Sequence, residues 1–137
     1  MTGAAVYVTS SGQLGVLASS ERYKTAIVPM GENTNKLQQL RPVSFHLKTD
    51  PNGALQYGLI AEEVAKVYPE LVIRDAAGKI QGVRYDELAP MLLNEVQQQQ
   101  DQLRDIKRQV AELKQINEAM QAAISKLQGK DERVAMR

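Results

Sequence analysis

The stretch LLNEVQQQQDQLRDIKRQVAELKQINEAMQAAISKL, residues 92–127, decides the fold. Its apolar residues recur at alternating spacings of four and three, and it contains neither Gly nor Pro. This pattern predicts a helix ~54 Å long with one apolar face that persists over about five heptads. We call this face the seam; it consists of Val96, Leu103, Val110, Asn117 and Ile124 at heptad positions a and Leu92, Gln99, Ile106, Leu113, Met120 and Leu127 at positions d.

Two interpretations of this helix differ in what covers the seam. A helix of this length that packed back on its own chain would overhang a small domain, so an intermolecular coiled coil is the better interpretation. Val or Ile at a with Leu at d favours two strands, whereas Leu103 followed by Ile106 favours more. Gln99 and Asn117 would fix register and orientation by bonding to their copies. We therefore expect a parallel oligomer of two or three chains.

The residues before this helix predict a small α+β unit of short strands and helices. Alternating apolar residues around polar turns indicate strands, and Pro69 stops a short helical pattern. The expected elements are two strands within residues 5–17, a helix over 33–40, strands over 42–48 and 57–60, a helix over 61–68, and a hairpin of 71–74 with 80–85.

Composition excludes several classes of function. A length of 137 residues allows one domain. The net charge of +1 is far from the strongly basic charge that is typical of nucleic-acid-binding proteins. No apolar run is long enough to span a membrane. With no Cys and a single His, thiolate metal sites, His-rich metal sites and a Ser/His/Asp triad within one chain are not expected. The N-terminus lacks the basic start and apolar stretch of a signal peptide.

Most polar candidates for chemistry have a plainer structural explanation. Glu62 and Glu63 are adjacent on a short helix, so their side chains diverge by about 100° and suit solvated or capping roles better than an acid/base pair. His46 alternates with Phe45 and is expected at a strand edge or an interface. The tyrosines expected to lie in the core with bonded hydroxyls are Tyr57, Tyr68 and Tyr85.

One cluster, ASSERYK at residues 18–24, brings a hydroxyl and a lysine together. Its structural explanation is a helix start, because Ser followed by Glu within a turn is common there, with Arg22 and Lys24 as surface charges. Spacing alone favours that explanation.

The residues around this cluster nevertheless resemble a known family. The sequence is similar, in order from about Leu14 to Leu127, to the peptidase S74 family, the intramolecular chaperone domain at the C-terminus of phage tailspikes, endosialidases and tail fibres, found also in myelin regulatory factor. Ser20 stands where the family usually has Asp, and Glu62 where Gln is common. The segments that carry the resemblance are LGVLASSERYKTAI (14–27), PVSF (42–45), YGLIAEEV (57–64), YPELV (68–72) and VRYDEL (83–88).

The resemblance implies a homotrimer that assists the folding of a β-rich client protein attached in front of it and then cuts itself off. It makes Ser19 the nucleophile, Lys24 the base and Ala18–Ser19 the scissile bond, with no cofactor or metal. The expected parts are residues 1–18 as the end of the client, 19–91 as the chaperone and protease domain, 92–128 as the coiled coil and 129–137 as a flexible tail. Neither nucleic acid nor membrane is an expected partner, and the implied setting is a phage tail component or the host cytoplasm during assembly.

A catalytic pair (dyad) of Ser19 and Lys24 requires a lysine that is deprotonated. A lysine at its reference pKa of about 10.4 is protonated and cannot act as a base, so it must be desolvated or placed beside another cation, such as Arg22 or a residue of a neighbouring chain. Two alternatives remain open: a trimerisation module whose Ser19 and Lys24 never align productively, and a regulatory coiled-coil domain attached to a DNA-binding factor.

Overall fold

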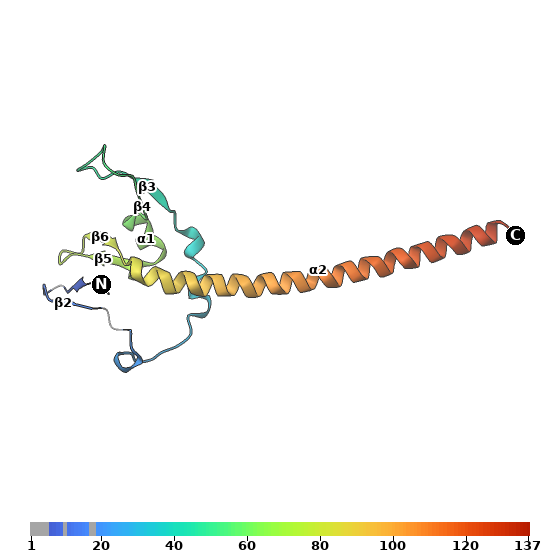
Figure 1. Ribbon diagram of the computed structural model, residues 1–137, viewed down its shortest axis with the longest axis horizontal. Coiled ribbons are helices and arrows are strands. Elements are labelled where there is room, and N and C mark those ends of the chain that lie inside the picture. The colour runs from blue at the N-terminus through green and yellow to red at the C-terminus, as the bar shows by residue number, and fades with distance from the viewer. Residues whose placement is uncertain (1–5, 10, 17–18) are drawn as a thin grey trace, which may run out of the picture.

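A small head of short elements sits at one end of a single long helix (Figure 1). The computed structural model describes residues 6–9, 11–16 and 19–137. This arrangement confirms the expected α+β organisation with a long C-terminal helix. The elements in chain order are β1 (Tyr7–Val8), β2 (Leu14–Gly15), η1 (Glu21–Tyr23), η2 (Gly31–Thr34), η3 (Leu37–Gln39), β3 (Val43–Phe45), β4 (Gln56–Gly58), α1 (Ala61–Val67), η4 (Pro69–Leu71), β5 (Val72–Arg74), β6 (Ile80–Val83) and α2 (Tyr85–Ala135), where η marks a 3₁₀ helix.

The described strands form three separate antiparallel pairs, β1 with β2, β3 with β4 and β5 with β6. In the second pair Ser44 lies opposite Tyr57, and in the third Val72 lies opposite Val83. Two-stranded ribbons are marginal in water, so each needs a further surface to pack on. The β5–β6 pair packs against α1. The β1–β2 and β5–β6 pairs agree with the predicted turn-linked strands and hairpin, and β3 and β4 lie within the stretches predicted as strands.

The core of the head is small. Val64 and Leu71 are almost completely buried, and the side chains around them come from α1, η4, β5, β6 and the first turn of α2. Each fully buried aliphatic side chain contributes roughly 1.5–3 kcal/mol, so a core of this size stabilises the head only modestly. In the described part of the chain the buried apolar residues are Val64, Tyr68, Leu71, Val72, Val83 and Leu88.

The helix predicted over residues 33–40 is wrong in kind: the structure has two 3₁₀ turns there, η2 and η3. The buried Tyr68 explains the difference. Its hydroxyl donates to the carbonyl of Asn33 at 3.0 Å and accepts the N–H of Lys36 at 3.1 Å. A continuous α-helix over residues 33–40 would use the Asn33 carbonyl internally, so the tyrosine hydroxyl replaces that helical hydrogen bond.

The three tyrosines expected in the core have different environments. Tyr68 is buried and its hydroxyl is bonded, as predicted. Tyr85 is half exposed, but its hydroxyl accepts the N–H of Leu59 at 2.8 Å. The prediction is wrong for Tyr57, whose side chain is 80% exposed.

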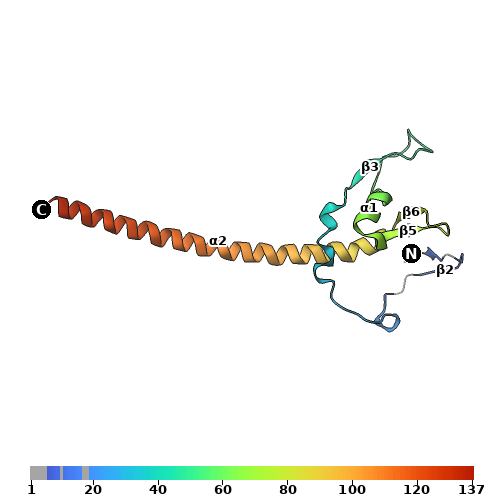
Figure 2. The ribbon, with the colours of Figure 1, turned by 180° about the vertical axis from the view of Figure 1, so that it is seen from behind.

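The long helix α2 starts earlier and ends later than the predicted stretch. It begins at Tyr85, continues through Pro90 and ends at Ala135, a length of about 76 Å at 1.5 Å per residue. Figure 2 shows it projecting from the head without contact along most of its length. The apolar side chains of the seam are exposed along it, from 44% at Val110 to 64% at Leu113.

The β5–β6 turn is held by one carboxylate. Oδ1 of Asp75 accepts the N–H groups of Lys79 at 2.9 Å and Ala77 at 3.0 Å, and Oδ2 accepts the side-chain amide of Gln81 at 2.9 Å. Gly78 takes the left-handed conformation at φ +80°, which glycine adopts without strain. The hydrogen bond from the Lys79 N–H, followed by that from Gln81, lowers the pKa of Asp75.

A lowered folded-state pKa means that Asp75 contributes stability at pH values above its ordinary range, and that this contribution is lost as the pH falls through the lowered pKa. We expect Asp75→Asn to unfold at lower urea concentration than the parent at pH 7, with the difference shrinking on acidification. Urea denaturation between pH 7 and pH 3, followed by tyrosine fluorescence, measures this. Asp50→Asn, on the exposed loop between β3 and β4, is the control. A difference between Asp75→Asn and the parent that is independent of pH contradicts the role given to the carboxylate.

Candidate active site

Ser19 and Lys24 meet across a single 3₁₀ turn. Ser20 precedes η1 in an extended conformation and Lys24 follows it, with the Lys24 N–H bonded to the carbonyl of Glu21 at 2.9 Å. The turn folds the chain back so that side chains five residues apart face each other. Nζ of Lys24 donates to Oγ of Ser19 at 3.2 Å.

The predicted pair is thus in hydrogen-bond contact, while the third predicted site residue, Ala18, lies outside the described residues. Both Ser19 and Lys24 are exposed in the single chain. Next to them the guanidinium of Arg22 stacks on the ring of Tyr23, 4.7 Å from its centre, which holds this cation against the turn. The arrangement has the reach for proton transfer between Oγ and Nζ.

A stretch without regular secondary structure, residues 25–30, connects the turn to the head, and we call it the arm. Its apolar side chains are open to solvent, with Val28 76% exposed. Ala26 has φ +50°, in the left-handed region that costs a non-glycine residue roughly 1–2 kcal/mol. Figures 1 and 2 show the arm on the opposite side of α2 from β3.

The arm ends at a polar joint with α2, formed by Gly31, Thr34, Asn94, Glu95 and Gln98. The amide of Asn94 donates to the carbonyl of Gly31 at 2.9 Å and to the hydroxyl of Thr34 at 2.8 Å. That hydroxyl donates in turn to Glu95 at 3.2 Å, and Gln98 also donates to the Gly31 carbonyl. Thr34 is completely buried, so the joint fixes the base of the arm beside the first heptads of the seam.

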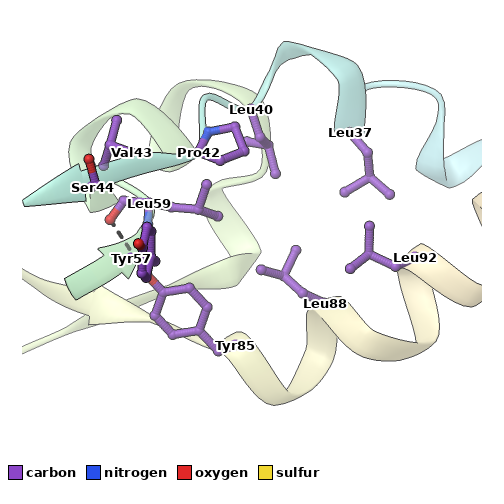
Figure 3. A pocket seen from close by; sticks show the side chains of 11 residues that line it. Leu37, Leu40, Pro42, Val43, Ser44, Tyr57, Leu59, Tyr85, Leu88 and Leu92 are labelled. Atoms are coloured by element: carbon purple, nitrogen blue, oxygen red, sulfur yellow. Dashed lines mark hydrogen bonds between the residues drawn. The ribbon is translucent and has the colours of Figure 1, made fainter. Parts of the chain in front are cut away.

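An apolar groove lies between the first turns of α2 and the segments of η3, β3 and β4 (Figure 3). Leu88 and Leu92 of α2 form one wall, and Leu37, Leu40 and Val43 form the other. Its volume is about 560 Å³, and none of the described residues that line it is charged. Composition and periodicity gave no sign of the groove or of the joint, because both are formed by residues far apart in the sequence.

The remaining polar candidates have structural partners. Glu63 accepts a bidentate ion pair from Arg41, at 2.5 and 3.2 Å, and the hydrogen bond from Arg41 lowers the pKa of Glu63. Glu62 is exposed. His46 is exposed, with Nδ1 3.0 Å from the carbonyl oxygen of Gly53. These positions agree with solvated or edge roles.

Across the described ranges, no group of three or more His, Cys, Asp or Glu side chains is placed to hold a metal ion. A search of the same residues finds no helix with the length and apolarity needed to cross a membrane.

The structure thus has a serine–lysine contact on a small α+β head at the end of a long helix. Residues 19–73 match the model of the Peptidase_S74 family, which is described as the chaperone of endosialidase. This match supports the resemblance seen in the sequence over these residues. The match contains both members of the Ser19–Lys24 contact. No curated protein gives a significant match to the chain.

The joint gives a prediction for the arm. Thr34→Val keeps the shape of the buried side chain but removes the hydroxyl that links Asn94 and Glu95, which costs about 1–3 kcal/mol. We expect the amides of residues 31–36 to exchange roughly tenfold to hundredfold faster, as measured by hydrogen exchange with mass spectrometry. Thr49→Val, on an exposed loop, is the control and should leave the exchange rates unchanged. Unaltered exchange of residues 31–36 in Thr34→Val would show that the joint does not hold the arm.

Proposed function

We propose that the chain is an intramolecular chaperone that forms a homotrimer, assists the folding of a client attached in front of it, and then releases itself by cutting the Ala18–Ser19 bond. The observation that carries the proposal is the 3.2 Å contact between Nζ of Lys24 and Oγ of Ser19, within a segment that matches a family described as a chaperone. The long helix with its exposed seam supports the association of chains.

The proposed reaction starts with a change in the direction of that hydrogen bond. In the single chain Nζ of Lys24 donates to Oγ of Ser19. As a base, the amine has lost a proton and accepts the one on Oγ. Oγ then attacks the carbonyl carbon of Ala18, closing a five-membered ring through Cβ, Cα and N of Ser19. Lys24 returns the proton to the departing amide nitrogen of Ser19, which leaves an ester between Ala18 and Ser19.

Water completes the cut. With Lys24 again removing a proton, water attacks the ester carbonyl, and the Ser19 hydroxyl leaves with the proton that Lys24 returns. The products are the carboxyl group of Ala18 and a chain that begins at Ser19. The dyad acts once, because the reacting bond belongs to its own chain.

Association of chains offers a physical way to switch this reaction on. A lysine amine in water stays protonated, whereas one covered by a neighbouring chain loses solvent that stabilises the charge. The seam supplies the driving force, since each apolar side chain buried there contributes roughly 1–3 kcal/mol. Gln99, which donates to Glu95 at 3.1 Å within the single chain, can exchange that partner for its copies and set the register.

The β1–β2 hairpin supports the proposal of a β-rich client. Val8, Leu14 and Val16 are exposed, so this pair of strands lacks a covering surface among the described residues. We propose that it continues the β-structure of the client. Cutting after Ala18 then separates the chaperone from its folded product, so the product can no longer unfold along the assisted path and is kinetically stable.

A second candidate, a trimerisation module that does not cut itself, is favoured by the exposure of both Ser19 and Lys24. The intact mass of the purified chain separates the two functions. Self-cleavage predicts loss of residues 1–18, abolished by Ser19→Ala and slowed about 10²–10⁴-fold by Lys24→Ala. Lys48→Ala removes an exposed lysine elsewhere and is the control. A chain that trimerises but keeps its full mass supports the structural module and contradicts self-cleavage.

The dependence of cutting on association is tested in the seam. Ile106→Asp combined with Leu113→Asp places charges at two d positions and should give monomers that do not cut, because burying an unpaired carboxylate is costly. Sedimentation gives the oligomeric state and mass spectrometry the extent of cutting. Gln115→Asp, on the outer face of α2, is the control. Efficient cutting by the double variant while it is monomeric refutes activation by association.

A further inference from the structure

The apolar face of α2 continues on the N-terminal side of Leu92, where it lines the groove. Tyr85 lies seven residues before Leu92 and therefore occupies the preceding d position, while Leu88 lies eight before Val96 and occupies position g beside the seam. All three residues of this upper turn, Tyr85, Leu88 and Leu92, line the groove. The helical wall of the groove is thus the same face of α2 that the seam follows lower down.

The groove is open where the seam would meet a neighbouring helix. Figure 3 shows Leu92 directed toward Leu37 across the groove and Leu88 directed into it, with Tyr57 at its edge. Leu92 and Tyr57 keep more than half of their side-chain surface exposed in the single chain. A groove of about 560 Å³ with an uncharged lining favours apolar side chains over a charged ligand.

The heptad pattern identifies which residue of a neighbour comes closest. In a parallel in-register coiled coil, a residue at g faces the residue at e five positions later in the adjacent helix, and these positions usually carry charged or polar side chains. The next three pairs along α2 are polar, Glu95 with Gln100, Gln102 with Lys107 and Gln109 with Lys114, and in the two after them a Gln stands opposite Ile116 or Ala123. At the level of the groove the pair is Leu88 with Leu93, and Leu93 is 58% exposed in the single chain.

We propose that the groove is an interface between copies of this chain, filled by Leu93 from α2 of a neighbouring copy. The proposal rests on the association of chains in the proposed function and extends it: the coiled coil continues into the heads and joins them. Each chain then contributes its Leu93 to the groove of a neighbouring head, and this side chain extends the small apolar core of that head.

The test uses the absence of Trp from the sequence. Tyr57→Trp places the sole tryptophan of the chain at the edge of the groove, on a side chain exposed enough for the change to leave the head folded. The background is full-length Ser19→Ala, so that the chain stays uncut. We expect the emission of Trp at this position to shift to shorter wavelength as the concentration rises, with the same midpoint that sedimentation gives for association.

Adding Leu93→Glu to this chain should weaken association at least tenfold and leave the emission unshifted even in the associated fraction. Gln97→Glu adds the same charge one turn further along, at an outward heptad position, and should behave like its parent. Association without an emission shift, a shift that does not depend on concentration, or equal effects of the two substitutions would each overturn the interface. A chain that stays monomeric at every concentration instead refutes the association in the proposed function, and the proposed interface with it.

Discussion

The constraint on which the whole structure depends is that very little apolar surface is buried within one chain. Six buried apolar side chains hold the described head together, and the 51-residue helix beside it leaves its seam in water. Polar contacts therefore carry an unusual share of the organisation. Tyr68 shapes the turns before β3, and Thr34 fixes those turns to α2. The association of copies that we propose would bury the exposed seam and so supply the missing apolar burial.

Elements whose cause is local could be predicted from the sequence. The spacing of apolar residues predicted α2, Pro69 marked the end of α1, and the residues Asp75 to Gly78 predicted the β5–β6 turn, because each of these signals acts within a few residues. The turns at residues 31–39 were predicted wrongly because the hydroxyl that shapes them lies on Tyr68, about thirty residues later. Propensity and periodicity hold no information about such a distant partner.

In the candidate site, too, the locally determined features were predictable and those that depend on distant residues were not. Ser19 and Lys24 were predicted through a family resemblance, and the contact between them needs only one local turn, so the structure brings them together within a single chain. The surroundings of the pair were not predictable from spacing. The anchoring of the arm depends on Asn94 and Gln98, more than sixty residues away, and the groove depends on three segments that meet only in the folded head.

The anchoring of the arm at Gly31 also limits where the serine–lysine pair can travel. The seven Cα–Cα steps from Lys24 to Gly31 reach at most ~25 Å even when fully extended, so Lys24 remains within that radius of the anchor at Gly31. Pairs carried by associated helices consequently share one small volume, in which tethering gives effective concentrations in the millimolar range. Encounters between a reactive turn and a neighbouring chain then depend on the length of six residues, and dilution of the assembled protein leaves them unchanged.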